Sequence, residues 1–285
     1  MTQIWYPLVE RLLPFEWARH EFMKNALLAV FLVSPGFAVM GTMVVNNKMA
    51  FFSDAVGHSA LTGIAIGVLL GFRDPLGAMT AFAVLLAVAV SLLKGVTGSS
   101  ADTVLGVLSS TSVALGIVLL SLKGGFQRYS RFLIGDLLSI APGDIVALAV
   151  VLGGVALLWG LMFNRLLLVS INPSLARSRG VNVKLVETVF CVAVAAMVAV
   201  SIQLVGIMLI NSLLVLPAAA ARNVSVNMRQ YHLASVAVSL VAGIVGLVIS
   251  YYLGTATGAT IVLAASCIYV LTLVLRGVRR GGVST

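Results

Sequence analysis

Charged residues are scarce in this chain. Asp, Glu, Lys and Arg make up 9% of its 285 residues, against about 25% in a typical soluble domain, while hydrophobic residues make up 60%. This composition excludes an ordinary soluble globular protein and indicates an integral membrane protein. The net charge of +9 does not indicate a nucleic-acid partner, because the Lys and Arg residues are scattered between apolar segments and form no single basic face.

Cysteines and catalytic motifs are scarce as well. Cys191 and Cys267 are the only cysteines and both lie in apolar segments, so the sequence offers no disulfide framework and no cysteine metal cluster. It contains no G-x-x-x-x-G-K-[ST] phosphate loop, which excludes ATP hydrolysis by this chain in the usual way. It also lacks H-E-x-x-H and G-x-S-x-G motifs. We therefore expect no enzyme and no permanently bound cofactor, and any ATP-driven step must be powered by a partner.

Long apolar runs separated by short polar breaks fill most of the chain. Since a helix needs about 20 residues to cross the hydrocarbon core of a bilayer, we predict an all-α, polytopic membrane protein with eight or nine spans, and ten as an upper limit. Two places leave the count open: the Phe132–Ile140 segment, which has the length of a re-entrant loop, and the very short break at Ile202–Val205. The nine predicted spans are Asn25–Val45, Met49–Leu70, Pro75–Leu93, Thr103–Leu122, Asp144–Phe163, Val183–Ile202, Val205–Ala221, Leu233–Leu253 and Thr257–Leu275.

The two ends of the chain differ from this apolar body. Residues 1–24 alternate charged side chains with Trp, Tyr, Phe and Leu, and they lack the layout of a cleavable signal. We expect either a short helix at the membrane interface or a solvated leader. No linker separates a second domain, so residues 25–275 are predicted to form one transmembrane domain. Residues 276–285 form a basic tail.

The distribution of Lys and Arg in the short connections predicts the orientation. Short cytoplasmic loops are enriched in these residues, and most of them fall on one side when the polar connection at 164–182 is placed in the cytoplasm. The segment with Lys123, Arg128 and Arg131 disagrees with this alternation and could belong to an interfacial helix. With nine spans, the N-terminus is predicted outside and the C-terminus inside.

Asp54 and His58 lie four residues apart inside the second predicted span. A charged carboxylate in the hydrocarbon region costs about 2.5 to 3.5 kcal/mol, so such residues usually face a cavity or a transport path. Positions i and i+4 share one face of a helix, and a carboxylate with an imidazole suits zinc, manganese or iron(II). Counted from Lys48, the pair lies about 9 to 15 Å into the span. A structural alternative remains: the His can satisfy a neighbouring carbonyl and the Asp can pair with a Lys or Arg.

The whole segment Met49–Gly67 carries a resemblance. It resembles the second-span signature of the permease subunits of ABC importers for zinc, manganese and iron(II), which reads roughly Gly-Asp, two residues, Ser-His, Ala-x-x-Gly. Ser53 replaces the usual Gly and Gly57 the usual Ser, both small residues. The matching positions are Asp54, His58, Ala60 and Gly63, and the resemblance therefore implies a metal-binding role for Asp54 and His58.

Two further stretches resemble the same family, in the same order. Val205–Ala221 is similar to the family's Val-Gly-x-Leu-Leu run that ends in Leu-x-x-Pro-Ala-x-x-Ala, and Leu247–Leu263 is similar to its closing spans. The resemblance extends from about Lys24 to Leu275. Without it, Pro217 would be read simply as a kink or a helix terminator.

The polar connection at about 171–187 is the other informative region. Pro173 followed by SLARSR and Gly180 predicts a short helix with a glycine stop. In the resembled family this position usually has an acidic residue, then Ala, then Gly, and touches the cytoplasmic ATPase. An ordinary positive-inside loop is the alternative. The residues of the predicted ATPase-docking loop are Asn172 at the acidic position, Ala176, Arg177, Arg179 and Gly180.

The resemblance implies a permease subunit of an ABC importer that moves a divalent transition metal ion across the bacterial inner membrane. Its implied partners are cytoplasmic ABC ATPase subunits, an extracytoplasmic metal-binding protein, a second permease chain and membrane lipid. A permease for a metal chelate of the siderophore or cobalamin type is one alternative. An ATP-independent metal carrier or channel is another, and the sequence does not identify the metal.

Overall fold

The structure is a computed structural model that describes residues 2–12, 14–72, 76–94, 101–122, 137–140 and 142–281. Helices are the only regular elements among these residues, and nine of them are long and apolar enough to cross a membrane. The prediction of an all-α polytopic protein is confirmed. The predicted re-entrant segment lies outside the described residues except for a short 3-10 turn, η2 (Leu137–Ser139), and the three basic residues that disagreed with the predicted orientation lie outside them altogether.

The chain divides into two compact units. Unit 1 comprises Met1–Thr42, Asp136–Leu152 and Leu204–Thr285, and unit 2 comprises Met43–Gly135 and Gly153–Gln203. Three of the four boundaries fall inside helices: α2 (Glu21–Asn46), α7 (Pro142–Ile171) and α9 (Val183–Val205). The fourth, at 135/136, lies outside the described residues. At these three boundaries the chain passes from one unit to the other within a helix. The single transmembrane domain remains a prediction.

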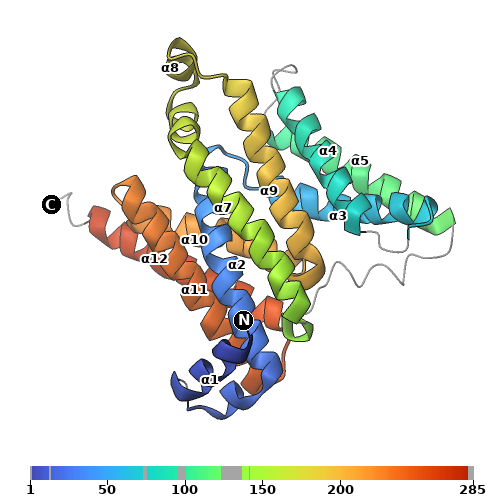
Figure 1. The fold of residues 1–285 in the computed structure, drawn as a ribbon. Coiled ribbons are helices and arrows are strands. Elements are labelled where there is room, and N and C mark those ends of the chain that lie inside the picture. The colour runs from blue at the N-terminus through green and yellow to red at the C-terminus, as the bar shows by residue number, and fades with distance from the viewer. Residues whose placement is uncertain are drawn as a thin grey trace. The chain divides into compact units, whose positions relative to one another are not determined.

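Unit 1 is built around α10 (Ile207–Val224), α11 (Met228–Leu253) and α12 (Thr257–Gly281), which pack against one another. These helices lie together in the orange to red part of the ribbon in Figure 1. Polar side chains bond between helices: the Ser235 hydroxyl donates to the Ala38 carbonyl at 3.0 Å, and Arg276 donates to the Asn223 side-chain oxygen at 3.1 Å. Interhelical bonds of this kind replace water where the surroundings are lipid.

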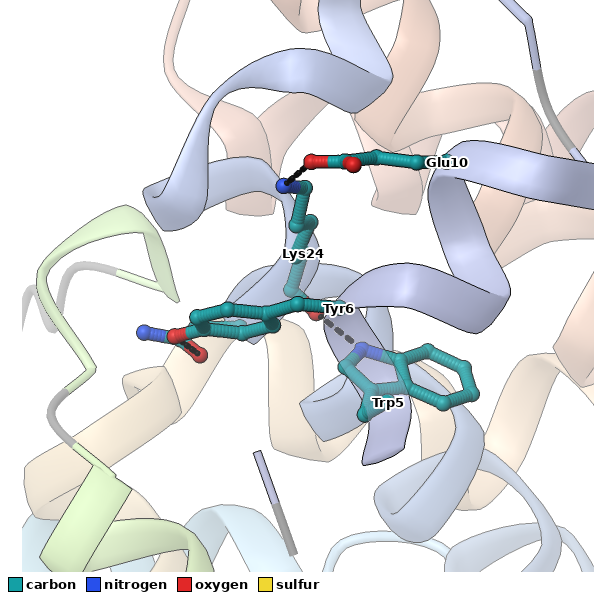
Figure 2. Close-up of polar contacts among 5 residues, drawn as sticks. Trp5, Tyr6, Glu10 and Lys24 are labelled. Carbon is teal, nitrogen blue, oxygen red and sulfur yellow. Dashed lines mark hydrogen bonds and ion pairs between the residues drawn. The ribbon is translucent and has the colours of Figure 1, made fainter. Parts of the chain in front are cut away.

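The N-terminal segment folds back onto the start of α2. It consists of α1 (Thr2–Leu12) and the 3-10 helix η1 (Glu16–Arg19). Trp5 Nε1 donates to the Lys24 carbonyl at 2.9 Å, and the Tyr6 hydroxyl donates to the Asn25 side-chain oxygen at 2.9 Å. Figure 2 shows the Lys24 ammonium reaching the Glu10 carboxylate, with the Tyr6 ring below it. A helix is therefore present, and its position at the membrane interface remains a prediction.

Unit 2 contains three helices that pack on one another: α3 (Phe52–Leu69), α4 (Leu76–Lys94) and α5 (Ala101–Leu122). They appear side by side in Figure 1. The unit also contains the later part of α7, the short helix α8 (Pro173–Ser178) and most of α9. In Figure 1, α8 crosses between the ends of α7 and α9.

Helix boundaries differ from the predicted spans mainly where polar residues continue a helix. The fifth span was predicted to end at Phe163, but α7 has 30 residues and ends at Ile171. At 1.5 Å per residue it is about 45 Å long, more than the hydrocarbon core of about 30 Å, so polar residues near its end cost little. The short break after Ile202 is a change of direction at Gly206, whose φ of 89° ends α9 and starts α10.

Candidate metal-transport site

Asp54 and His58 lie one turn apart on α3, where the sequence placed them. His58 Nε2 is 3.4 Å from Asp54 Oδ1, and the two side chains are 44% and 47% exposed. Two ligands that bind a tetrahedral ion at about 2.1 Å lie about 3.4 Å from each other. The spacing of the two atoms therefore suits two neighbouring ligands of a zinc-sized ion.

The rest of α3 is held by its neighbours, which fixes the direction of this pair. An added Cβ on Gly63 would lie 2.5 Å from the Met79 Cα, so only glycine allows α3 and α4 to approach this closely. The Thr62 hydroxyl donates to the Ser112 carbonyl of α5. In all, 72% of the span is buried within the chain. On a helix so largely buried, two half-exposed polar side chains mark a distinct open face.

That face provides two ligands from one chain. Among the described residues, no group of three or more His, Cys, Asp and Glu is close enough to hold a metal ion. Phe51, one turn before Asp54, is 64% exposed and continues the open face. Zinc sites usually have three or four protein ligands, so further ligands would have to come from outside the described part of this chain.

The predicted docking loop forms the helix that its sequence indicated. Asn172 Oδ1 accepts hydrogen bonds from the Ser174 and Leu175 amides at 3.0 and 3.1 Å, which caps α8. Pro173 occupies the first turn, where its missing N–H costs nothing. Gly180 has a φ of 74° and ends the turn. The amide oxygen of Asn172 thus does the capping that an acidic residue would do at this position.

The other residues of the predicted docking loop comprise a buried residue and an exposed surface. Ala176 is completely buried, whereas Arg177, Arg179 and Gly180 are exposed. The Val181 amide donates to the Ala176 carbonyl at 3.0 Å, which closes the turn after α8. The backbone of the loop is therefore held by its own hydrogen bonds, and the loop presents two guanidinium groups to its surroundings.

Comparison with known proteins identifies the family. The model of the ABC 3 transport family matches residues 19–276. The chain belongs to the ABC 3 transport family. Over 259 residues it is 32% identical to the high-affinity zinc uptake system membrane protein ZnuB of Haemophilus influenzae, covering 90% of this chain and 98% of the relative.

Other members of the family carry different names. The manganese import system permease protein ScaB of Streptococcus gordonii is 29% identical, with 88% of this chain and 90% of the relative covered. Among solved structures, PsaBC from Streptococcus pneumoniae in complex with Fab is similar with a TM-score of 0.76 and 26% identity, covering 93% of this chain and 94% of that chain. An inward-facing ABC transporter of metal-chelate type has a TM-score of 0.66 but only 15% identity, so it shares the fold alone.

Membership in this family, with nine apolar helices in the described part, makes the chain a multi-pass membrane protein, which in bacteria belongs to the inner membrane.

One ion pair of this ABC 3 member was not predicted from the sequence. Glu187 stands at the end of a predicted span, where solvation alone would account for it, but it lies 3.7 Å from Lys94 of α4 and both side chains are partly buried. The signal was available, since Lys94 and Glu187 are opposite charges at span ends predicted to lie on the same side.

Proposed function

We propose that this chain is the membrane-spanning permease subunit of an ATP-driven importer for a divalent transition metal ion: zinc, manganese or iron(II). The observation that carries this proposal is the Asp54–His58 pair, whose 3.4 Å separation fits two ligands of one ion on the open face of an otherwise packed membrane helix. The names of the zinc and manganese permeases similar to this chain support the same substrate class.

A second permease chain completes the site in this proposal. A two-fold interface presents the same patch from both subunits, so two copies of the open face of α3 would bring two Asp54 and two His58 side chains to one ion. Four ligands match the number that zinc prefers. A closely related permease with an equivalent pair would serve equally well. The site must also release its ion, so we expect little metal to be retained at rest.

Energy for transport comes from a partner in this proposal, because the sequence contains no phosphate loop. The capped helix α8 and the exposed Arg177 and Arg179 form the docking surface for cytoplasmic ABC ATPase subunits. An extracytoplasmic metal-binding protein delivers the ion to the other face. ATP-driven closure of the ATPases displaces α8, reorients the spans and opens a path past Asp54 and His58.

Reconstitution tests this function directly. The permease and its ATPase subunits are placed in proteoliposomes with ATP enclosed, and metal-loaded binding protein is added outside. We expect uptake of free metal ion that stops when a non-hydrolysable ATP analogue replaces ATP. Uptake without the ATPase subunits would identify a carrier or channel, and uptake of a metal chelate in place of the ion would identify a chelate permease. Either result would overturn the proposal.

A further inference from the structure

The proposed docking helix α8 and the helix α3, which carries Asp54 and His58, are separate helices of unit 2. A movement of α8 must therefore be passed through packed side chains to reach the pair. The turn after α8 leads directly into α9. Asn182 Oδ1 accepts from the Leu185 amide at 3.1 Å and caps the first turn of α9. Together with the bond between Val181 and Ala176, this cap joins α8 to α9 without a flexible linker.

One turn into α9, two polar contacts join this helix to α4. Glu187 pairs with Lys94 at 3.7 Å, and the next residue, Thr188, lies 2.6 Å from the Ser91 hydroxyl. The Thr188 hydroxyl donates to the Lys184 carbonyl at 2.8 Å, so its oxygen accepts the bond from Ser91. Both contacts connect consecutive residues of α9 to residues one turn apart on α4.

The surroundings make these contacts stronger than those of a surface ion pair. The Lys94 and Glu187 side chains are 26% and 31% exposed, and Ser91 is 4% exposed. A pair at this depth is less screened by water and salt than an exposed pair. A small cavity adjoins the pair and is lined by residues from four segments of unit 2, among them Met49, Leu166, Lys94, Glu187 and Phe190. Met49 immediately precedes α3.

From α4 the connection continues to the ligand pair. The backbone of Met79 on α4 lies so close to Gly63 of α3 that an added Cβ would be 2.5 Å from the Met79 Cα. We therefore expect α3 and α4 to move together. Asp54 and His58 are on α3 as well. The chain of contacts therefore runs from α8 through α9 and α4 to α3, and its polar step is the set of four residues Ser91, Lys94, Glu187 and Thr188.

We propose that these four residues form a latch that transmits the movement of the ATPase-docking loop to the helix pair α3–α4 and so couples ATP hydrolysis to metal movement. The latch rests on the proposed function of the chain. The Lys94–Glu187 and Ser91–Thr188 contacts persist while the helices move, so that α9 and α4 move together. The four are positioning residues: none of them touches the ion.

The ratio of metal transported to ATP hydrolysed tests the latch, since loss of stability alone would lower both rates together. Lys94→Gln and Glu187→Gln are each expected to assemble with the ATPase subunits and hydrolyse ATP, while uptake per ATP falls about tenfold. The charge-exchanged variant, with Lys94→Glu and Glu187→Lys, is expected to recover most of the ratio. Arg222→Gln removes an exposed positive charge on α10, which belongs to unit 1, and is expected to leave the ratio unchanged.

A covalent replacement gives a second readout if the charge variants assemble poorly. In a background with Cys191→Ala and Cys267→Ala, the pair Ser91→Cys and Thr188→Cys is oxidised to a disulfide that joins α4 to α9. A latch that stays closed predicts transport with the disulfide formed, and predicts that the disulfide rescues Lys94→Gln. Block of transport by the disulfide, or wild-type coupling in both single charge variants, would overturn the latch. If the wild-type complex itself moves no metal, the proposed function fails instead.

Discussion

His58 Nε2 lies 3.4 Å from Asp54 Oδ1, one helical turn away on α3. Elsewhere α3 contacts its neighbours closely, as at Gly63 against the backbone of Met79, while the Asp54 and His58 side chains remain about half exposed. In the proposed function, a single chain supplies two ligands of a four-ligand site. The proposed site would give this membrane helix a reason to retain a carboxylate and an imidazole despite the cost of placing them there.

The cap of α8, the proposed docking helix, gives a prediction that separates the folding of this helix from its charge. Asn172→Ala removes the acceptor for two amides and is expected to destabilise α8 by about 1 kcal/mol, about a fivefold change in its folded population. Metal-dependent ATP hydrolysis by the reconstituted complex should fall accordingly. Asn172→Asp keeps the acceptor and should retain activity. Equal activity in Asn172→Ala and the wild type would show that the cap is not needed for coupling.

Gly180 provides a second prediction in the same loop. Its φ of 74° is costly for residues with a side chain, by about 1 to 2 kcal/mol, whereas Asn tolerates this conformation better than Ala. We expect Gly180→Ala to reduce uptake and ATPase co-purification more than Gly180→Asn does. No atom lies within 4 Å of an added Cβ, so a steric clash inside the chain does not contribute. The reverse order of the two variants would contradict the conformational argument.

The ion pair of the N-terminal segment predicts a stability effect. The Lys24 side chain is 4% exposed and Glu10 is 55% exposed, so Glu10→Gln leaves a buried ammonium with the Tyr6 ring 5.1 Å away. We expect a loss of about 1 to 2 kcal/mol, less than for a fully buried pair because water reaches Glu10. Thermal unfolding in detergent should show a Tm lower by a few degrees. Glu16→Gln, an exposed acid in η1, is the control and should leave Tm unchanged.

Sidedness gives a prediction that does not depend on transport. In a chain with Cys191→Ala and Cys267→Ala, Ser178→Cys on α8 should react with an impermeant thiol reagent only after the cytoplasmic face is opened. Ala256→Cys, in the turn between α11 and α12, should react in intact cells. Labelling of Ser178→Cys in intact cells would contradict the predicted orientation.

Much of the fold follows from hydropathy and from a few local signals. Apolar runs of span length become helices because lipid offers the backbone no other hydrogen-bond partners. The short helix α8 could be predicted because Pro173 and Gly180 act locally, at its start and its stop. The apolar pattern predicts the end of the fifth span at Phe163, where polar residues begin. The helix α7 continues to Ile171, because a helix that leaves the membrane tolerates polar residues.

The interhelical contacts could not be derived in the same way. Lys94 and Glu187 are both visible as charges near span ends, but their pairing depends on how α4 packs against α9 and not on local sequence. The remaining ligands of the proposed metal site could not be predicted either. The sequence indicates Asp54 and His58 and does not show which groups would complete the site. Gly63 was recognised by resemblance, while the reason for it, backbone contact with Met79, required the packed structure.

The most direct test of the proposed site is uptake of radiolabelled zinc, manganese and iron(II) into proteoliposomes that contain the full complex. Asp54→Ala and His58→Ala are each expected to lower uptake at least about tenfold, since loss of a group that merely supports a metal ligand already costs 10- to 100-fold. Assembly with the ATPase subunits should be unchanged. The controls Asp102→Ala and His20→Ala remove an exposed carboxylate and an exposed imidazole elsewhere and should transport normally. Near-normal uptake in both Asp54→Ala and His58→Ala would show that the pair is structural and contradict the proposed site.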